Sequence, residues 1–184
     1  ADRAASALLA SFRVPTKWPN SLSRLKVPTT ISIADETNRV DLTKLSLVTI
    51  DGEDARDFDD AVFAERLPRR GWRLVVAIAD VAHYVKLGSP LDAEARKRGN
   101  SVYLPDRVVP MLPESLANGI CSLNPDEKRL AVVCDMTVSA SGRVSKYMFY
   151  DAVIRSHARL TYEEVADKPD RFPVLFEVYR AFRK

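Results

Sequence analysis

The sequence predicts an α+β fold, in which helices surround a mixed, largely antiparallel β-sheet. Apolar stretches of strand length recur along the chain, at residues 45–50, 61–67, 72–79, 129–139 and 143–157. Two connections, Pro68-Arg69-Arg70-Gly71 and Ala140-Ser141-Gly142, are too short to hold a crossover helix, so the strands they join form hairpins. Residues 72–79 are apolar enough to be a central strand covered on both faces.

Helices are expected outside this sheet, at residues 4–12, 90–98, 113–118 and 162–167. The second has Ser89 as its cap, Pro90 in the first turn and Gly99 after its last turn. The fourth begins with a capping box made by Thr161 and Glu164. Helices of this kind can pack around the sheet without separating its hairpins.

The chain divides near residue 40. Residues 1–40 read as an N-terminal helix followed by an irregular arm or linker, because Pro, Ser and Thr dominate residues 14–34 and no hydrophobic period emerges. Residues 41–184 carry the strands and form the body, cut short at its C-terminus. A chain of 184 residues is long enough for one sizeable core.

Composition excludes several classes of protein. The chain has two cysteines, Cys121 and Cys134, and two histidines, with no zinc-ligand spacing, and we expect both thiols to be reduced. No apolar run reaches the length of a membrane span and no signal peptide opens the chain, so a cytoplasmic location is expected. The net charge of +3 fits a polyanionic partner and fits scattered surface charge equally well.

An acidic segment, residues 51–60, is the main functional signal. Six of its ten residues are carboxylates, although apolar strand-like runs flank it on both sides. Two carboxylates about 4 Å apart repel each other by roughly 4 kcal/mol at an effective dielectric near 20. Such a cluster requires a cation or shared protons, and a hard divalent ion with oxygen ligands suits attack on phosphate.

Acidic segments of this kind have two other common interpretations. A calcium-binding loop is excluded by spacing, because Gly52 stands second instead of sixth and Val62 stands where the twelfth-position Glu belongs. A solvated acidic loop remains open, and composition alone does not separate it from a metal site.

The chain resembles the ribonuclease II / ribonuclease R family of exoribonucleases, and the ribonuclease R branch most. The motifs occur in the family's order between about residues 41 and 167: residues 49–61 with Asp57-Phe58-Asp59-Asp60, residues 76–81 and 83–85, residues 98–113 with Ser101-Val102-Tyr103-Leu104-Pro105, residues 121–125 and residues 156–162. One departure is Ala77, where that branch often has His. The resemblance covers the front half of the family's catalytic domain.

The resemblance implies that the active-site acids are Asp51, Asp57, Asp59 and Asp60. By the same resemblance Asp51, Asp57 and Asp60 bind Mg²⁺, with Mn²⁺ as the alternative, and Asp59 orients the ion and the attacking water. In an extended segment Asp57 and Asp59 point the same way and Phe58 points to the core, so a bend is needed to bring Asp60 in. The sequence leaves open whether one ion or two are used.

The resemblance also assigns two substrate-binding tyrosines. It implies that Tyr103 stacks on the terminal nucleotide and that Tyr162 favours RNA over DNA near the 2′-hydroxyl. Without the resemblance both would be ordinary half-buried packing residues. Phosphate contacts are expected from five basic residues, although solvated helix faces explain the first three equally well: Arg96, Lys97, Arg98, Arg107 and Arg159. Asp80 either supports the active-site acids from behind or caps a helix. His83 is expected to be a packed, hydrogen-bonded histidine.

The function implied is that of a fragment of a magnesium-dependent 3′-to-5′ exoribonuclease, which hydrolyses single-stranded RNA to nucleoside monophosphates. In the family, flanking OB-fold domains grip the RNA, and a later segment completes the active site. The isolated fragment is therefore expected to be weakly active or inactive. Two alternatives are a non-catalytic RNA-binding relative and a metal-dependent phosphoesterase or DNase that shares only the acidic segment.

Overall fold

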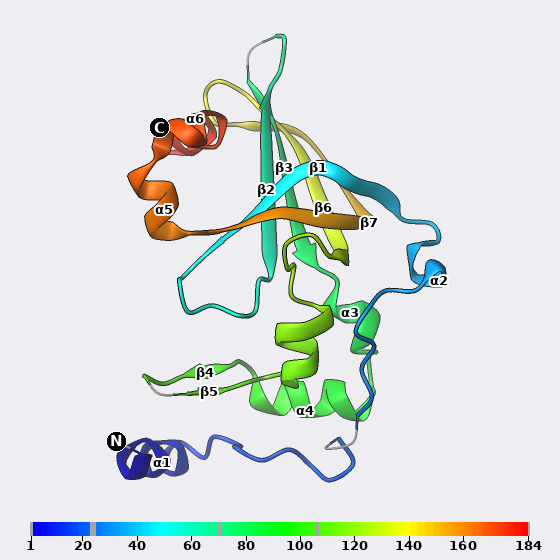
Figure 1. The fold of residues 1–184 in the computed structure, drawn as a ribbon, viewed down its shortest axis with the longest axis vertical. Coiled ribbons are helices and arrows are strands. Elements are labelled where there is room, and N and C mark those ends of the chain that lie inside the picture. The colour runs from blue at the N-terminus through cyan, green and yellow to red at the C-terminus, as the bar shows by residue number, and fades with distance from the viewer. Residues whose placement is uncertain (1, 23–24, 70, 106, 184) are drawn as a thin grey trace.

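The centre of the fold is a closed five-stranded barrel. The structure, a computed structural model, describes residues 2–22, 25–69, 71–105 and 107–183. Among these the barrel strands run in the order β1 (Val40–Asp51), β2 (Asp60–Arg66), β3 (Trp72–Ala79), β6 (Lys128–Val138) and β7 (Val144–Thr161) (Figure 1). Every neighbouring pair is antiparallel except β1 and β7, which are parallel and close the barrel. The predicted mixed, largely antiparallel sheet is confirmed. The sequence did not predict that this sheet closes into a barrel.

Alanines occupy part of the barrel interior, beside larger buried side chains such as Leu47, Val75 and Ile154. Ala61, Ala77, Ala131 and Ala152 are fully buried, and they face inward on paired strands together with Val133. A barrel of so few strands has little internal volume, so alanine fits where larger residues would force the strands apart. The inward-facing alanines therefore suit a barrel with a small internal volume.

The outer face of β3 is covered only in part, which corrects the expectation of burial on both faces. Ile78 is 47% exposed at one end of the strand. At the other end Leu74 packs with Val138 and with Val178 of α6 (Pro173–Phe182). Arg66 and Trp72 hold α6 in place by donating hydrogen bonds to the carboxylate of Glu177, at 2.9 Å from Arg66 Nε and from Trp72 Nε1.

Between β7 and α6 lie α5 (Tyr162–Asp167) and a 3₁₀ turn, η2 (Pro169–Arg171). The predicted capping box is present: Thr161 Oγ1 accepts from the backbone N–H of Glu164 at 3.1 Å, and Glu164 Oε2 accepts from that of Thr161 at 2.8 Å. The first residue of α5 therefore follows directly from the end of the barrel.

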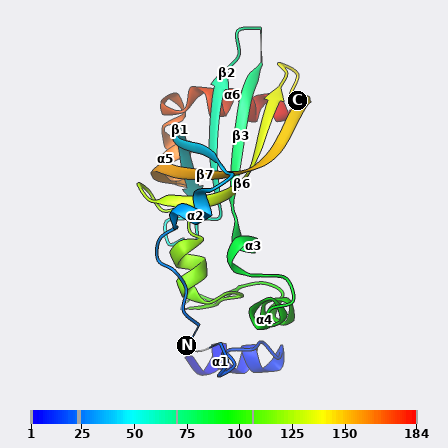
Figure 2. The same ribbon diagram turned by 90° about the vertical axis from the view of Figure 1, so that its right-hand side faces the viewer.

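A second layer lies beneath one end of the barrel (Figures 1 and 2). It contains α3 (Val81–Tyr84), α4 (Pro90–Arg98), the two-stranded ribbon β4 (Val102–Tyr103) and β5 (Val108–Val109), and η1 (Ser115–Ile120). The bounds of α4 match the prediction. The helix expected at residues 113–118 is instead the π-helical turn η1, and Gly119 lies inside it with φ −101° and ψ −113°.

The N-terminal arm runs below this layer and then along its side toward the barrel (Figures 1 and 2). It begins with α1 (Asp2–Ser11) and ends with a short helix, α2 (Ile33–Glu36), which the sequence did not predict. Arg98 ties the arm to α4, because its guanidinium lies 3.7 Å from the Trp18 ring centroid and donates to the carbonyl of Lys17 at 2.9 Å. The Arg98 side chain is 2% exposed and pairs with Glu94, so the expectation of a phosphate contact there is wrong.

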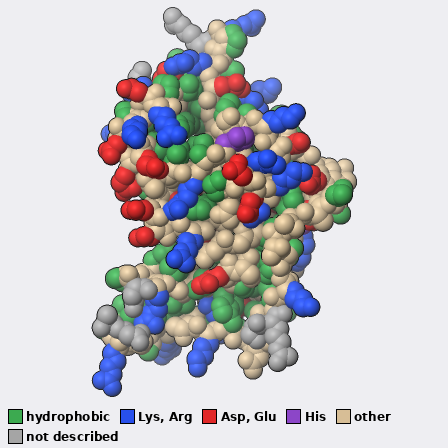
Figure 3. Space-filling model, viewed as in Figure 1, with side chains coloured by type: hydrophobic (Ala, Val, Ile, Leu, Met, Phe, Trp, Pro, Cys, Tyr) green, Lys and Arg blue, Asp and Glu red, His purple; other side chains and the backbone are tan. Residues whose placement is uncertain are grey.

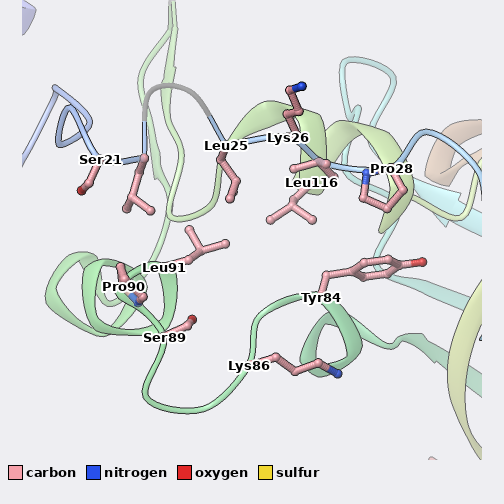
Figure 4. Close-up of a pocket in the computed structure, with 12 residues that line it drawn as sticks. Ser21, Leu25, Lys26, Pro28, Tyr84, Lys86, Ser89, Pro90, Leu91 and Leu116 are labelled. Atoms are coloured by element: carbon pink, nitrogen blue, oxygen red, sulfur yellow. The ribbon is translucent and has the colours of Figure 1, made fainter.

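The arm, α3, α4 and η1 line an open, mostly apolar pocket of about 310 Å³. Figure 4 shows Leu25, Leu91 and Leu116 turned toward one another across it, with Lys26 and Lys86 at its sides. None of the described residues that line it belongs to the acidic segment. In the described part of the chain, no helix is both long enough and apolar enough to span a membrane.

We expect Gly142→Ala to destabilise the fold by about 2–4 kcal/mol. Gly142 has φ +78°, and an added Cβ would strike the backbone carbonyl of Ala181 in α6, so backbone strain and overpacking both act. Gly88→Ala is the matched control, because Gly88 has φ +77° but open space around it. Urea unfolding should show a loss of only about 1 kcal/mol for Gly88→Ala; equal losses would contradict the close contact between α6 and the β6–β7 hairpin.

Candidate active site

The acidic segment connects the end of β1 to the start of β2 at the end of the barrel that faces the β4–β5 ribbon (Figure 1). Asp51 is the last residue of β1 and Asp60 the first of β2. These strands are antiparallel neighbours, with Val48 opposite Val62, so the two ends of the segment return to the same edge of the barrel. The fold therefore brings residues from both ends of the segment into one region.

Backbone hydrogen bonds fix the second half of the segment. The carbonyl of Asp59 accepts from the N–H of Ala79 at 2.8 Å, and that of Phe58 accepts from the N–H of Leu123 at 2.9 Å. Phe58 is buried at 4% exposure, as predicted from its alternation with Asp57 and Asp59. The aspartates are thus held on the outer side of a segment whose aromatic side chain is anchored in the core.

The carboxylates act on one another electrostatically. Burial first, and then the charges of Asp60 and Asp57, raise the pKa of Asp51. Burial, Asp57, Asp60 and Asp51 together raise the pKa of Asp59, and burial raises the pKa of Asp60. Asp51, Asp59 and Asp60 therefore lie in surroundings that disfavour their charged forms, and Asp57 is close enough to act on two of them.

One carboxylate oxygen lacks a partner. Asp51 Oδ2 is buried and makes no hydrogen bond. A buried anionic oxygen without a donor is costly unless a cation or proton satisfies it. Across the residues that the structure describes, no three His, Cys, Asp or Glu side chains form a ready-made cluster around an ion. Carboxylate oxygens are the ligands that hard divalent cations prefer, and the unsatisfied Oδ2 atom of Asp51 suits such an ion.

Tyr103 lies at the site through its hydroxyl group, which donates to Asp57 Oδ2 at 2.8 Å. That bond to a carboxylate, together with burial, raises the pKa of Tyr103 to about 12. The side chain is nevertheless 64% exposed. Its hydroxyl group is therefore fixed beside the acids while much of the residue remains accessible.

Tyr162 reaches the same end of the barrel by another route. It follows Thr161, which pairs with Asp51 across the parallel β1–β7 ladder, and it is 59% exposed. The structure therefore places Tyr162 near the end of β1, and Tyr103 on the ribbon opposite.

Arg159 braces the first half of the acidic segment. Its Nη2 atom donates to the carbonyl of Glu53 and, at 3.4 Å, to that of Ala55, and its guanidinium lies 5.0 Å from the Phe58 ring centroid. Its charge lowers the pKa of Asp51 and so opposes the larger effects of burial and of the other acids. Glu53 and Asp54 are exposed, as expected for solvated positions.

Asp80 and His83 belong to a structural network outside the acidic cluster. Asp80 caps α3 by accepting from the N–H of His83 at 3.1 Å, and it forms an ion pair with Arg39 at 2.5 Å. His83 Nε2 lies 2.9 Å from Asp35 Oδ1 in α2. Of the two roles considered for Asp80, the structure supports the cap.

Sequence reasoning missed Ser122 and Arg129. Both are buried, and Ser122 contacts the backbone of the acidic segment on either side of Asp57. Ser122 lies in the Cys121–Pro125 motif, but nothing in that motif's composition indicates contact with residues so far away along the chain. A serine between apolar residues signals only a polar group that needs a partner.

Comparison with known proteins identifies the family. The RNB domain model matches residues 39–173. Ribonuclease R of Vibrio parahaemolyticus is 56% identical over 160 residues, which cover 86% of this chain and 19% of that protein. Ribonuclease R of Escherichia coli is 55% identical over 159 residues, covering 85% of this chain and 20% of that protein. The chain therefore spans about a fifth of the length of these curated relatives.

Solved structures agree. Mycoplasma genitalium RNase R in complex with double-stranded RNA superposes with a TM-score of 0.83 at 33% identity, covering 96% of this chain and 33% of that one. Yeast Ssd1, a pseudonuclease, has a TM-score of 0.75 at 21% identity, covers 91% of this chain and 21% of that one, and shows the shared fold alone. With the RNB match spanning most of the chain, this protein belongs to the RNB-domain family that includes ribonuclease R.

Proposed function

We propose that this chain is the front part of the catalytic domain of a 3′-to-5′ exoribonuclease. In this proposal it acts in the cytoplasm and hydrolyses single-stranded RNA to nucleoside monophosphates. Residues 41–184 would form the first part of that domain, and residues 1–40 an arm leading into it. The observation that carries the proposal is the unsatisfied oxygen of Asp51, which lies among carboxylates whose charges raise the pKa of Asp51 and of Asp59. Such a site is arranged to accept positive charge and stabilise a phosphoryl group.

Asp51, Asp57 and Asp60 would hold Mg²⁺, with Mn²⁺ as the alternative. When bound, the ion would polarise the phosphoryl oxygen and lower the pKa of a bound water. Asp59 would orient the attacking water, because the residue is accessible to solvent while its backbone carbonyl is held by the N–H of Ala79. The protein's part is to keep these carboxylates together despite their repulsion.

Tyr103 and Tyr162 would bind the 3′-terminal nucleotides. The exposed side chain of Tyr103 would stack on a base, and its hydroxyl bond to Asp57 would fix the nucleotide relative to the acids. Tyr162 would contact the 2′-hydroxyl and so favour RNA over DNA.

The rest of the RNA grip would come from other parts of the complete protein. Figure 3 shows Lys and Arg side chains interspersed with Asp and Glu over one face, without a continuous basic surface. Tight binding of RNA draws on clustered positive charge along the phosphate backbone. The relatives are about five times as long as the matched region, which leaves room for flanking OB-fold domains.

Asp59→Asn in the complete protein should lower kcat on single-stranded RNA at least about 100-fold, because a carboxylate that orients the attacking water is replaced by a neutral amide. RNA affinity should stay within a few-fold, since the binding surface is unchanged. Single-turnover kinetics on a single-stranded RNA oligonucleotide with a free 3′ end measures the rate of hydrolysis and the RNA affinity. Asp54→Asn, an exposed acid of the same segment, is the control.

Unchanged turnover in Asp59→Asn would contradict the site. Tight RNA binding without turnover in the unsubstituted protein would favour the non-catalytic relative. Preferential cleavage of DNA or of small phosphoesters, tested in parallel, would favour the phosphoesterase or DNase alternative.

Asp51→Asn should stabilise the metal-free protein. Its folded-state pKa is raised, so ionised Asp51 costs stability above that pKa, and the cost disappears as the pH falls below the unfolded value. We expect a melting temperature about 2–4 °C higher at pH 7 in EDTA, a difference that shrinks as the pH is lowered. Mg²⁺ should raise the melting temperature of the unsubstituted protein but not of Asp51→Asn. If Mg²⁺ raised the melting temperature of both proteins equally, the assignment of Asp51 as a metal ligand would be wrong.

The chain of residues 1–184 on its own should degrade RNA poorly or not at all, and bind Mg²⁺ weakly. Its acids are present, but the remaining channel and the flanking domains are missing from it. Stepwise degradation of a labelled oligonucleotide, compared between this chain and the complete protein at equal concentration, measures the difference. Full-rate degradation by the chain alone would refute this prediction.

A further inference from the structure

We propose that Ser122 is a positioning residue that holds Asp57 in the active site by fixing the backbone on both sides of it. The inference rests on the proposed function, because it concerns the geometry of the same acids. It assigns a mechanical role to a side chain that cannot reach the substrate.

The contacts of Ser122 are directed at the two neighbours of Asp57. Its Oγ accepts from the backbone N–H of Phe58 at 3.1 Å and donates to the backbone carbonyl of Arg56 at 3.0 Å. One hydroxyl group therefore satisfies a donor and an acceptor that flank a single residue. With both flanking peptide groups fixed, the direction of the Asp57 Cα–Cβ bond is also fixed.

Ser122 is fully buried, which separates this role from catalysis. Both hydrogen bonds of its hydroxyl lead to backbone atoms, and neither leads to a base that could activate it as a nucleophile. Its hydroxyl is also uncharged, so it restrains the segment without neutralising the carboxylates or competing with a cation.

The backbone of Ser122 is itself fixed by a hydrogen bond from Arg129. Arg129, 4% exposed at the start of β6, donates from Nε to the carbonyl of Ser122 at 2.9 Å and from Nη1 to that of Lys128 at 3.0 Å. The next residue, Leu123, donates its N–H to the carbonyl of Phe58 at 2.9 Å. The position of Asp57 is thereby coupled to the barrel strand β6.

Asp57 has a second restraint, which comes from Tyr103, a residue proposed to bind the substrate. The hydroxyl of Tyr103 donates to Asp57 Oδ2, and Tyr103 is proposed to stack on the terminal nucleotide. A nucleotide that moves Tyr103 would also move the Asp57 carboxylate if nothing else held it. Ser122 provides the restraint that does not depend on the substrate.

The test is Ser122→Ala in the complete protein. We expect kcat on single-stranded RNA to fall about 10- to 100-fold, because a small misplacement of a catalytic group has effects of this size. KM should change less than about threefold. Binding of Mn²⁺, followed by electron paramagnetic resonance without RNA, should weaken several-fold, which a purely structural serine would not cause.

Ser156→Ala is the matched control. Ser156 is 1% exposed, and its Oγ donates to the carbonyl of Ala158 at 3.1 Å, so the variant also loses a buried hydroxyl hydrogen bond. It should lower the melting temperature but keep kcat and Mn²⁺ affinity. Ser122→Cys, which keeps a weak donor and acceptor, should recover part of kcat and is the variant to use if Ser122→Ala does not fold.

The outcomes separate the two proposals. If the unsubstituted protein binds no Mn²⁺ and turns over no RNA, the proposed function fails. If it does both, and Ser122→Ala matches it in kcat and Mn²⁺ affinity, the positioning role alone is overturned. Equal losses of kcat in Ser122→Ala and Ser156→Ala would also overturn it, because they would reflect general destabilisation.

Discussion

Mutual repulsion among carboxylates is the constraint around which this structure is organised. Burial and neighbouring carboxylates raise the pKa of Asp51 and Asp59, and burial raises the pKa of Asp60. In an unrestrained loop these acids would move apart and so relieve their repulsion. The barrel prevents this by anchoring both ends of the segment in antiparallel neighbours, and by burying Phe58 between the acids. Under the proposed function, this repulsion would favour binding of a cation between the acids.

The parallel pairing of β1 with β7 determines what surrounds these acids. It sets Asp51 opposite Thr161 and Thr49 opposite Arg159, so residues late in the chain reach the acidic segment. In an open sheet β1 and β7 would be opposite edges, and neither Arg159 nor Tyr162 would approach Asp51. Barrel closure is therefore a requirement of the site as well as a way of protecting sheet edges.

Local signals predicted the parts of the fold that depend on neighbours in the sequence. The bounds of β3 and α4, the capping box at Thr161 and the burial of Phe58 follow from alternation and helix-end chemistry. Closure of the barrel, the π-helical turn and the burial of Arg98 against Trp18 depend on residues distant in sequence, which no local pattern shows. The acids were visible as a pattern, whereas their brace at Ser122 was not.

The repulsion among the carboxylates limits which side chains can restrain the backbone of the acidic segment. A lysine or arginine aimed at the carboxylates would hold them, but its charge would satisfy Asp51 and displace a metal ion. The two side chains that restrain the backbone of the segment avoid this in different ways: Ser122 is neutral, and Arg159 directs its hydrogen bonds to the carbonyls of Glu53 and Ala55. Burial and the neighbouring acids still outweigh the effect of Arg159 on the pKa of Asp51. The segment is therefore fixed in shape while its negative potential remains available to a divalent cation.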